Sequence, residues 1–298
     1  MFYYTLYGTK LISDVAFPQL VKVSSFDPDA VPHITIKEGK LPAKYLFDRN
    51  CYSDFLQNES YLSNSFCYLY VENGNSITYQ RKNNASDAVL NPYILGWGIA
   101  MLFHQRGMLA IHCSCVANEK GAMLISGYSG SGKSTTTAYL LENGYRLMAD
   151  DIAMLDISDK NHIMAYPAFP YQKLCRDAAE RHKLSLDDMI YIDETKDKFL
   201  VPYEGSFSLE PERVRSIVVL SARNTSQVLS EELSGIEKWY ACLDALFLGP
   251  LLGDRVHSAE YGKPCLDLAS ACPVYKITRP YELDTRKEIF NIIQSINN

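Results

Sequence analysis

Apolar and polar residues alternate over short runs through roughly the first eighty positions of the chain, and turn residues separate these runs. A period of two is typical of strands that bury one face. Strands are therefore predicted at residues 2–8, 10–15 and 33–39. A hairpin is predicted at residues 65–80, with its turn at Asn73, Gly74 and Asn75.

The pattern changes after the polar segment at residues 82–88. Residues 88–107, "AVLNPYILGWGIAMLFHQRG", are apolar nearly all round, as in a buried helix. Strands and helices then alternate, which is typical of an α/β domain. We expect a β-rich N-terminal subdomain at residues 1–85, suited to recognising a substrate or partner, and an α/β domain at residues 86–298.

The elements of the second domain follow from the same patterns. Strands are predicted at residues 108–118, 122–126, 145–155, 214–222 and 274–278. Helices are predicted at residues 134–144, 173–184, 234–249 and 286–296. Gly144 is expected to end the first of these helices.

Composition narrows the class of protein. The chain has 298 residues, of which 47% are apolar, and a formal net charge of -6. This charge argues against binding to nucleic acid or to a membrane surface, because both are polyanionic. The first residues lack a basic region followed by a long apolar run, so we expect a cytoplasmic protein. The eight cysteines show no C-x-x-C pair and are expected to be reduced thiols.

The segment "GYSGSGKST" at residues 127–135 matches the phosphate-loop pattern G-x-x-x-x-G-K-[ST], between a predicted strand and a predicted helix. Glycines allow backbone N–H groups to turn toward an anion, and the helix N-terminus adds its positive dipole end. Lys133 supplies a charge for the outer phosphates, and the Ser134 hydroxyl suits Mg²⁺. The alternative is a glycine-rich turn capped by Ser or Thr. The predicted nucleotide-binding residues are Gly127, Ser129, Gly130, Ser131, Gly132, Lys133, Ser134 and Thr135.

Two adjacent acidic residues, Asp150 and Asp151, stand inside the strand predicted at residues 145–155. Neighbours on a strand face opposite ways, so we expect the two carboxylates to have different roles. One could hold Mg²⁺ and the other could accept a proton from a reacting hydroxyl. The alternative is that the strand has reached solvent before a turn at residues 158–161.

His112 lies among apolar residues in "LAIHCSCV" and, taken alone, fits a buried core position. Together, "IHCSCV", "GYSGSGKST" and "GYRLMADDI" resemble the catalytic P-loop domain of the bacterial HPr kinase/phosphorylase family and its stand-alone relatives, over about residues 90–155. That family shares its core with ATP-dependent phosphoenolpyruvate carboxykinase. Lys133 follows His112 by 21 positions, and Asp151 follows Lys133 by 18, as in the family.

The resemblance implies an α/β fold with a P-loop core and a kinase that uses ATP and Mg²⁺. Lys133 would hold the β- and γ-phosphates, Asp151 would accept the proton of the attacking hydroxyl, and His112 would assist beside it. Asp150 would then be the partner of Mg²⁺, directly or through water, together with Ser134. The family assembles as oligomers, so the resemblance allows a homo-oligomer.

The chain also departs from the family. Its glycine-containing signature after the acidic pair is replaced by "YPAFPYQKLCRDAA" at residues 166–179. We therefore expect a kinase whose acceptor is another hydroxyl, such as a serine of a protein or ribosomal peptide, or a small molecule. Lys198, Arg176 and Arg181 are candidates for the missing positive charge, and the alternative for each is a solvated surface position. The alternatives are a non-catalytic nucleotide-binding regulator and a lyase of the carboxykinase type.

Overall fold

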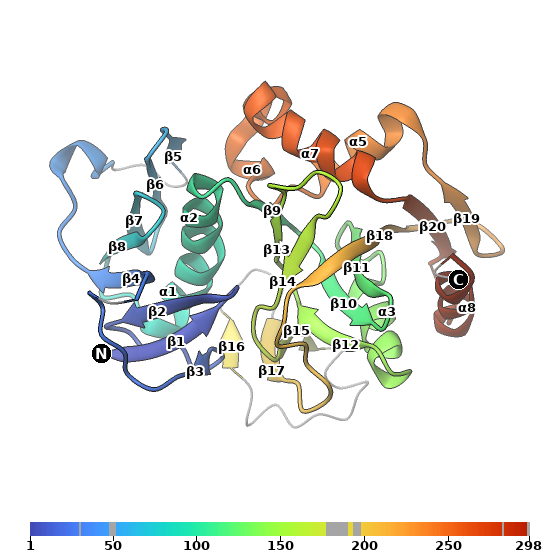
Figure 1. Cartoon of the computed structure of the whole chain (residues 1–298), viewed down its shortest axis with the longest axis horizontal. Coiled ribbons are helices and arrows are strands. Elements are labelled where there is room, and N and C mark those ends of the chain that lie inside the picture. The colour runs from blue at the N-terminus through green and yellow to red at the C-terminus, as the bar shows by residue number, and fades with distance from the viewer. Residues whose placement is uncertain (30, 48–51, 177–189, 193–197, 282, 297–298) are drawn as a thin grey trace.

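A computed structural model of the chain describes residues 1–29, 31–47, 52–176, 190–192, 198–281 and 283–296. These residues form a mixed α/β protein with three sheets (Figure 1). In the described part, no helix combines the length and apolar character that crossing a membrane requires.

The N-terminal sheet has the strand order β3-β1-β2-β4-β8-β7-β6-β5. The strands are β1 (Phe2–Leu6), β2 (Thr9–Ser13), β3 (Val21–Lys22), β4 (His33–Glu38), β5 (Tyr52–Phe55), β6 (Glu59–Ser63), β7 (Cys67–Glu72) and β8 (Ser76–Arg81). A short 3-10 helix, η1, covers Ala43–Tyr45. The predicted strands and the hairpin are confirmed, and Asn73 and Gly74 take the positive φ angles (54° and 61°) that tight hairpin turns require.

The buried helix predicted at residues 88–107 is confirmed as three consecutive segments: α1 (Asp87–Pro92), a π-helical turn η2 (Tyr93–Gly98) and α2 (Ile99–Gln105). Pro92 has no N–H to donate, so the regular hydrogen-bond ladder changes there. Five consecutive residues from Ile99 to Phe103 are at most 1% exposed. Figure 1 shows α2 between the N-terminal sheet and the rest of the chain.

The second sheet has the order β12-β10-β11-β18-β14-β13-β9, with β20 beside β18 and β19 beside β20. Its strands are β9 (Leu109–Ile111), β10 (Ser114–Asn118), β11 (Gly121–Gly127), β12 (Arg146–Ala149), β13 (Ala153–Asp156), β14 (Met164–Tyr166), β18 (Glu212–Arg223), β19 (Leu229–Glu232) and β20 (Val274–Pro280). Strands β11, β18 and β20 are mutually parallel, so their carboxyl ends share one edge.

Two predicted strands are wrong in one respect, because each is interrupted. The strand predicted at residues 108–118 divides into β9 and β10, and the one at residues 145–155 divides into β12 and β13. Asp150 and Asp151 therefore lie between strands and not within one. Asp151 has a φ of 79°, which ends strand geometry and removes the two-residue alternation from which we inferred that the carboxylates face opposite ways.

The third sheet, β15-β17-β16, corrects another prediction. Its strands are β15 (Tyr171–Cys175), β16 (Ile190–Ile192) and β17 (Lys198–Pro202). The helix predicted at residues 173–184 is therefore wrong at 173–175, which belong to β15, and residues 177–184 lie outside the described residues.

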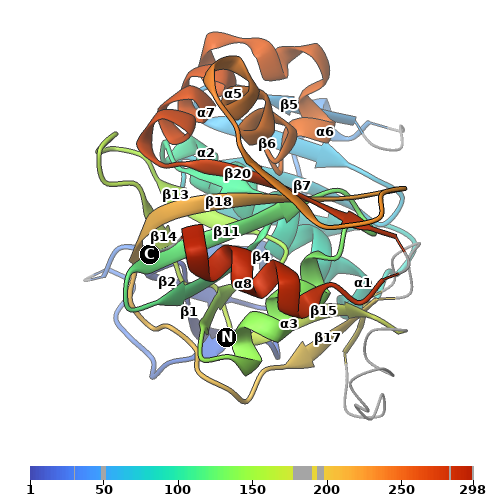
Figure 2. The ribbon, with the colours of Figure 1, turned by 90° about the vertical axis from the view of Figure 1, so that its right-hand side faces the viewer.

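The remaining helices of the described residues pack on the second sheet and at its edge. They are α3 (Lys133–Glu142), α5 (Gly235–Asp244), α6 (Gly249–Leu252), the 3-10 helix η3 (Gly253–His257), α7 (Ala259–Ala271) and α8 (Arg286–Ile296). Figure 2 shows α3 and α8 lying together across the sheet. The helix predicted at residues 234–249 ends earlier, at Asp244.

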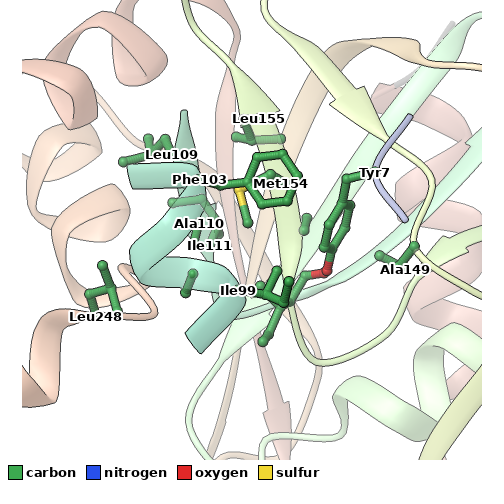
Figure 3. Close-up of a cluster of buried hydrophobic side chains, with 14 of the residues drawn as sticks. Tyr7, Ile99, Phe103, Leu109, Ala110, Ile111, Ala149, Met154, Leu155 and Leu248 are labelled. Atoms are coloured by element: carbon green, nitrogen blue, oxygen red, sulfur yellow. The ribbon is translucent and has the colours of Figure 1, made fainter. Parts of the chain in front are cut away.

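The largest apolar core runs from the N-terminal sheet through α2 into the second sheet. Figure 3 shows Tyr7, Phe103 and Met154, from three distant parts of the chain, meeting in it. The division at residue 85 follows β8 and stays a prediction. Six cysteines are free, buried thiols, as expected; Cys51 and the side chain of Cys175 lie outside the described part.

Candidate functional site

The glycine loop connects β11 to α3 along the carboxyl edge of the parallel strands. Gly127, Gly130 and Gly132 have φ angles of 137°, 83° and 103°, which favour glycine. A Cβ atom on Gly127 would lie 2.2 Å from the carbonyl oxygen of Leu220. All three glycines therefore suit the backbone path, and Gly127 is also confined by the neighbouring strand β18.

Lys133 is the first residue of α3, and its side chain folds back over the loop. Its Nζ donates to the carbonyl oxygens of Gly127 at 2.5 Å and Tyr128 at 3.5 Å. Ser131 Oγ is buried and has no hydrogen-bond partner among the described residues. The ten-residue helix α3 begins at this loop, so its first N–H groups and dipole favour an anion there.

A groove of about 650 Å³ adjoins the loop. Its wall includes Ser134 and Thr135 of α3, Arg279 of β20 and Tyr281, whose side chain is 64% exposed. Arg279 Nε donates to the carbonyl oxygen of Ser131 at 3.0 Å and so joins the end of β20 to the loop. The groove is large enough for a small-molecule ligand that extends from the loop.

The two strand interruptions lie at the same level of neighbouring strands. Ile111 pairs with Ala153, and Cys115 pairs with Ala149. The intervening segments, residues 112–114 and 150–152, are therefore opposite each other. We call residues 150–152 the acidic break. This register brings His112 to Asp151 across 39 positions of sequence.

The imidazole of His112 contacts both the main chain and the side chain of Asp151. His112 Nδ1 lies 3.0 Å from the carbonyl oxygen of Asp151 and 3.6 Å from its Oδ1. A carbonyl oxygen only accepts, so Nδ1 carries the hydrogen in this contact. The positive φ of Asp151 is a local strain of the kind found at functional sites.

Lys173, in β15, contacts both aspartates. Its main-chain N–H donates to Asp150 Oδ2 at 2.7 Å, and its Nζ lies 3.4 Å from Asp151 Oδ2. Ser114 Oγ donates to the other oxygen of Asp150, Oδ1, at 2.5 Å. The two carboxylates therefore have different environments: Asp150 is held by neutral donors, while Asp151 is beside a cation and an imidazole.

Burial raises the pKa of the Asp150 carboxyl above its ordinary value. The hydrogen bonds from Ser114 and from the Lys173 N–H oppose this rise, and the negative charge of Asp151 adds to it. Proton binding at Asp150 is thus easier than at an exposed aspartate, and a nearby cation would favour its charged form.

The loop and the acidic break are close neighbours. Ser126, just before Gly127, donates from Oγ to the carbonyl oxygen of His112 at 3.4 Å. Burial raises the pKa of the Cys113 thiol, Asp150 raises it further, and the charge of Lys133 lowers it. The contact of Ser126 with His112 thus joins the strand that precedes the loop to the segment opposite the acidic break.

Sequence reasoning missed Lys173, Ser114 and Arg279. Lys173 is predicted to lie in a helix, but it lies in strand β15, and the residue pattern YQKLC gives no alternation that would have indicated a strand. Arg279 ends an apolar strand, and the shared carboxyl edge of parallel strands is where ligands bind in α/β sheets. Of the other candidates for positive charge, Arg176 has its guanidinium carbon 4.9 Å from the ring centroid of Phe199, and Arg181 and the Lys198 side chain are outside the described part.

The residues suit Mg²⁺ only in part. Both carboxylate oxygens of Asp150 already accept hydrogen bonds, so direct coordination would displace a donor, whereas contact through water would not. Ser134 is the second residue of α3, next to Lys133, so its hydroxyl stays a candidate ligand for Mg²⁺. Among the described residues, no three His, Cys, Asp or Glu side chains form a metal-binding group. Magnesium in phosphate sites typically takes one or two protein ligands, with phosphate and water as the others.

No family model matches the chain, and no curated protein matches it. Among solved structures, the chain is similar to the HPr(Ser) kinase/phosphatase from Coxiella burnetii, with 12% identity and a TM-score of 0.32. The match covers 62% of this chain and 94% of that one. A TM-score this low does not assign a shared fold, so the functional assignment depends on the geometry of the site itself.

Proposed function

We propose that the protein is an ATP- and Mg²⁺-dependent kinase that transfers the γ-phosphoryl group to a hydroxyl. One observation carries the proposal: the glycine loop, with Lys133 at the start of α3, adjoins a strained aspartate held by His112 and Lys173. Phosphoryl transfer needs these two parts together, a phosphate cradle and a group that takes the acceptor's proton.

The glycine loop would bind the phosphates through main-chain N–H groups. Lys133, which now donates to the carbonyl oxygens of Gly127 and Tyr128, would exchange these for phosphate oxygens. The adjoining groove would take the nucleoside, with Tyr281 exposed on its wall. Mg²⁺, when bound, would neutralise charge on the phosphates, and Ser134 together with Asp150 through water are the residues to hold it.

Asp151 would act as the general base. The acceptor oxygen forms a bond to the γ-phosphorus, the bond from that phosphorus to the β-phosphate oxygen breaks, and ADP leaves with the electron pair. The acceptor's proton passes to Asp151. Lys173 and His112 would keep its carboxylate in place, because each contacts a different carboxylate oxygen.

Isothermal titration calorimetry with ATP·Mg²⁺ tests the nucleotide half of the proposal. Lys133→Ala should weaken binding by about tenfold to a hundredfold, the worth of a charge-assisted hydrogen bond. Lys120→Ala, at the exposed turn between β10 and β11, is the control and should bind as the wild type does. Unchanged affinity in a folded Lys133→Ala protein would overturn the proposal. If the protein bound nucleotide but formed no ADP with any acceptor tested, the alternative of a non-catalytic nucleotide-binding regulator would be favoured.

A further inference from the structure

A second, smaller cavity lies at the acidic break, on the side of the N-terminal sheet. It has a volume of about 70 Å³. Its wall includes Tyr7 and Gln19 from the N-terminal region, Asn91 from α1, and Asp150, Asp151 and Lys173. The two carboxylates of the site therefore line this cavity together with residues from the N-terminal region and α1, which are distant in sequence.

Two buried amide side chains line this cavity, and their oxygens accept no hydrogen bond from the described residues. Gln19 and Asn91 are 4% and 8% exposed. Gln19 Oε1 and Asn91 Oδ1 have no hydrogen-bond partner among the described residues. Asn91 Nδ2 lies 3.4 Å from the carbonyl oxygen of Ala16, which turns Oδ1 away from that contact. A buried acceptor without a donor is costly, so each such oxygen needs an explanation.

The wall that carries these amides is attached to the acidic break. Tyr7 is 4% exposed, and its hydroxyl donates to the carbonyl oxygen of Ile152 at 2.9 Å, across 145 positions of sequence. Tyr7 also packs edge-on against Phe103 of α2, with 5.5 Å between ring centroids. The unpartnered oxygens are thus held at a defined place relative to Asp151.

We propose that this cavity binds the hydroxyl-bearing end of the phosphoryl acceptor, and that Gln19 and Asn91 select acceptors whose hydroxymethyl group is flanked by hydrogen-bond donors. The inference rests on the proposed kinase function. Two acceptor oxygens require donors, either N–H or O–H groups, and Asp151, which also lines the cavity, meets the reacting hydroxyl.

The volume limits the ligand. At about 30 Å³ of liquid volume per water molecule, the cavity has room for roughly two waters. A hydroxymethyl group and the donors next to it fit this space, and the remainder of the acceptor stays outside. Specificity in such a site comes from the buried polar groups, because a ligand without donors leaves them unpaired.

Saturation-transfer NMR with three small alcohols tests the assignment, with the full chain in ADP and Mg²⁺. The probes are L-serinamide, which adds N–H donors beside its hydroxymethyl group, glycerol, which adds O–H donors there, and 1-propanol, which has no donor besides its one hydroxyl. The wild type should bind L-serinamide or glycerol more tightly than 1-propanol. The stronger of the two responses identifies the donor type, and either one supports the proposal.

Gln19→Leu and Asn91→Leu keep approximate size and remove the acceptor oxygen. Each should weaken binding of the preferred probe by about threefold to tenfold, the worth of one hydrogen bond, and leave 1-propanol binding unchanged. The melting temperature of Gln19→Leu should stay the same or rise, since an unpartnered buried oxygen is removed. Asn91→Leu also removes the long contact of Nδ2 with the Ala16 carbonyl oxygen, so its melting temperature should change little. Gln227→Leu, at an exposed position after β18, is the matched control and should change nothing.

The outcomes separate the two proposals. Wild-type affinity for the preferred probe in both folded variants, or equal binding of all three alcohols by the wild type, would overturn the cavity assignment. ATP·Mg²⁺ affinity, measured on the same proteins, should be unaffected by either substitution. If the wild type bound no nucleotide, the kinase proposal would fail, while a probe preference lost in Gln19→Leu or Asn91→Leu would still support the ligand chemistry of this cavity.

Discussion

The glycine loop and the acidic break are neighbours in space but are built in opposite ways. The loop is local: Lys133 contacts carbonyl oxygens five and six positions away, and the glycines supply the backbone angles. The acidic break depends on distant partners. Asp150 accepts from Ser114, 36 positions earlier, and from Lys173, 23 positions later.

This difference decides what each region can tolerate. A change in the loop acts on a few consecutive residues and on the strand beside it. A change at the acidic break acts through strand register, because His112 reaches Asp151 only while β9 pairs with β13 and β10 with β12. Substitutions in the loop should therefore alter phosphate binding, whereas substitutions around the break should alter the chemical step.

The largest effect is expected from Asp151→Asn. Asparagine tolerates the positive φ at this position but cannot take the acceptor's proton, so kcat should fall by about 10²- to 10⁴-fold. Nucleotide affinity should persist because the loop is untouched. The measurement is ADP formation under saturating ATP.

Asp150→Asn is the matched comparison. It keeps hydrogen-bonding capacity toward Ser114 and the Lys173 N–H but loses a negative charge near the phosphates. The Mg²⁺ concentration for half-maximal rate should rise, with a smaller loss of kcat. Identical effects of the two substitutions would contradict the different roles assigned to the two carboxylates.

Two glycines test how local the loop is. Gly127→Ala should lower the free energy of unfolding by about 3 kcal/mol, because φ is 137° and the new Cβ would lie 2.2 Å from the Leu220 carbonyl oxygen. Gly130→Ala, with φ 83° and no atom within 4 Å of its Cβ, should cost only about 1 kcal/mol. Urea denaturation measures both. Equal costs would mean that the contact with β18 does not constrain the loop.

Lys173→Met removes the cation beside Asp151 but keeps the main-chain N–H that binds Asp150. We expect kcat to fall by about tenfold, the worth of roughly 1.4 kcal/mol of positioning, with little change in ATP affinity. Lys173→Arg should recover part of the loss. If Lys173→Met weakened ATP binding and left kcat unchanged, Lys173 would belong to the phosphate site and not to the base.

The same contrast explains what the sequence could predict. The loop was readable because glycine spacing, a preceding apolar run and a following helix all lie within about twenty residues. The hairpin at Asn73 and Gly74 was readable for the same reason. The strand interruptions at His112 and Asp151 could not be predicted from the sequence. Apolar residues flank both positions as they would in a continuous strand, and only the pairing between distant strands shows that each strand is interrupted.

Lys173 shows the limit more sharply. No local pattern ties it to the aspartates; its strand reaches them by packing beside the break, and its main chain supplies one of the two contacts. Gln19 and Asn91 are similar: one follows β2 in a turn and the other lies in α1, and only the fold brings both to one cavity. The part these three residues take in the site therefore depends on where the fold places them, which their residue types alone do not show.

The smallest expected effect concerns the link between the N-terminal region and the break. Tyr7→Phe removes the hydroxyl that donates to the carbonyl oxygen of Ile152 and leaves that oxygen buried. At neutral pH the free energy of unfolding should fall by about 1 kcal/mol. Urea denaturation of the two proteins, repeated from pH 7 to pH 11, measures this difference.

The stability difference between the wild type and Tyr7→Phe should also depend on pH, in a direction that the pKa of Tyr7 determines. Burial raises the pKa of Tyr7 well above 10.0, and the negative charge of Asp151 adds to the rise. The hydroxyl ionises in the unfolded chain near pH 10 but stays protonated in the folded one, so the unfolded state binds fewer protons and this contribution to stability falls as pH rises above 10. Phenylalanine has no proton to lose, and the other tyrosines are common to both proteins. The advantage of the wild type over Tyr7→Phe should therefore be constant below about pH 9 and shrink above pH 10; a gap that stayed constant to pH 11 would mean that the Tyr7 hydroxyl is not buried against Ile152.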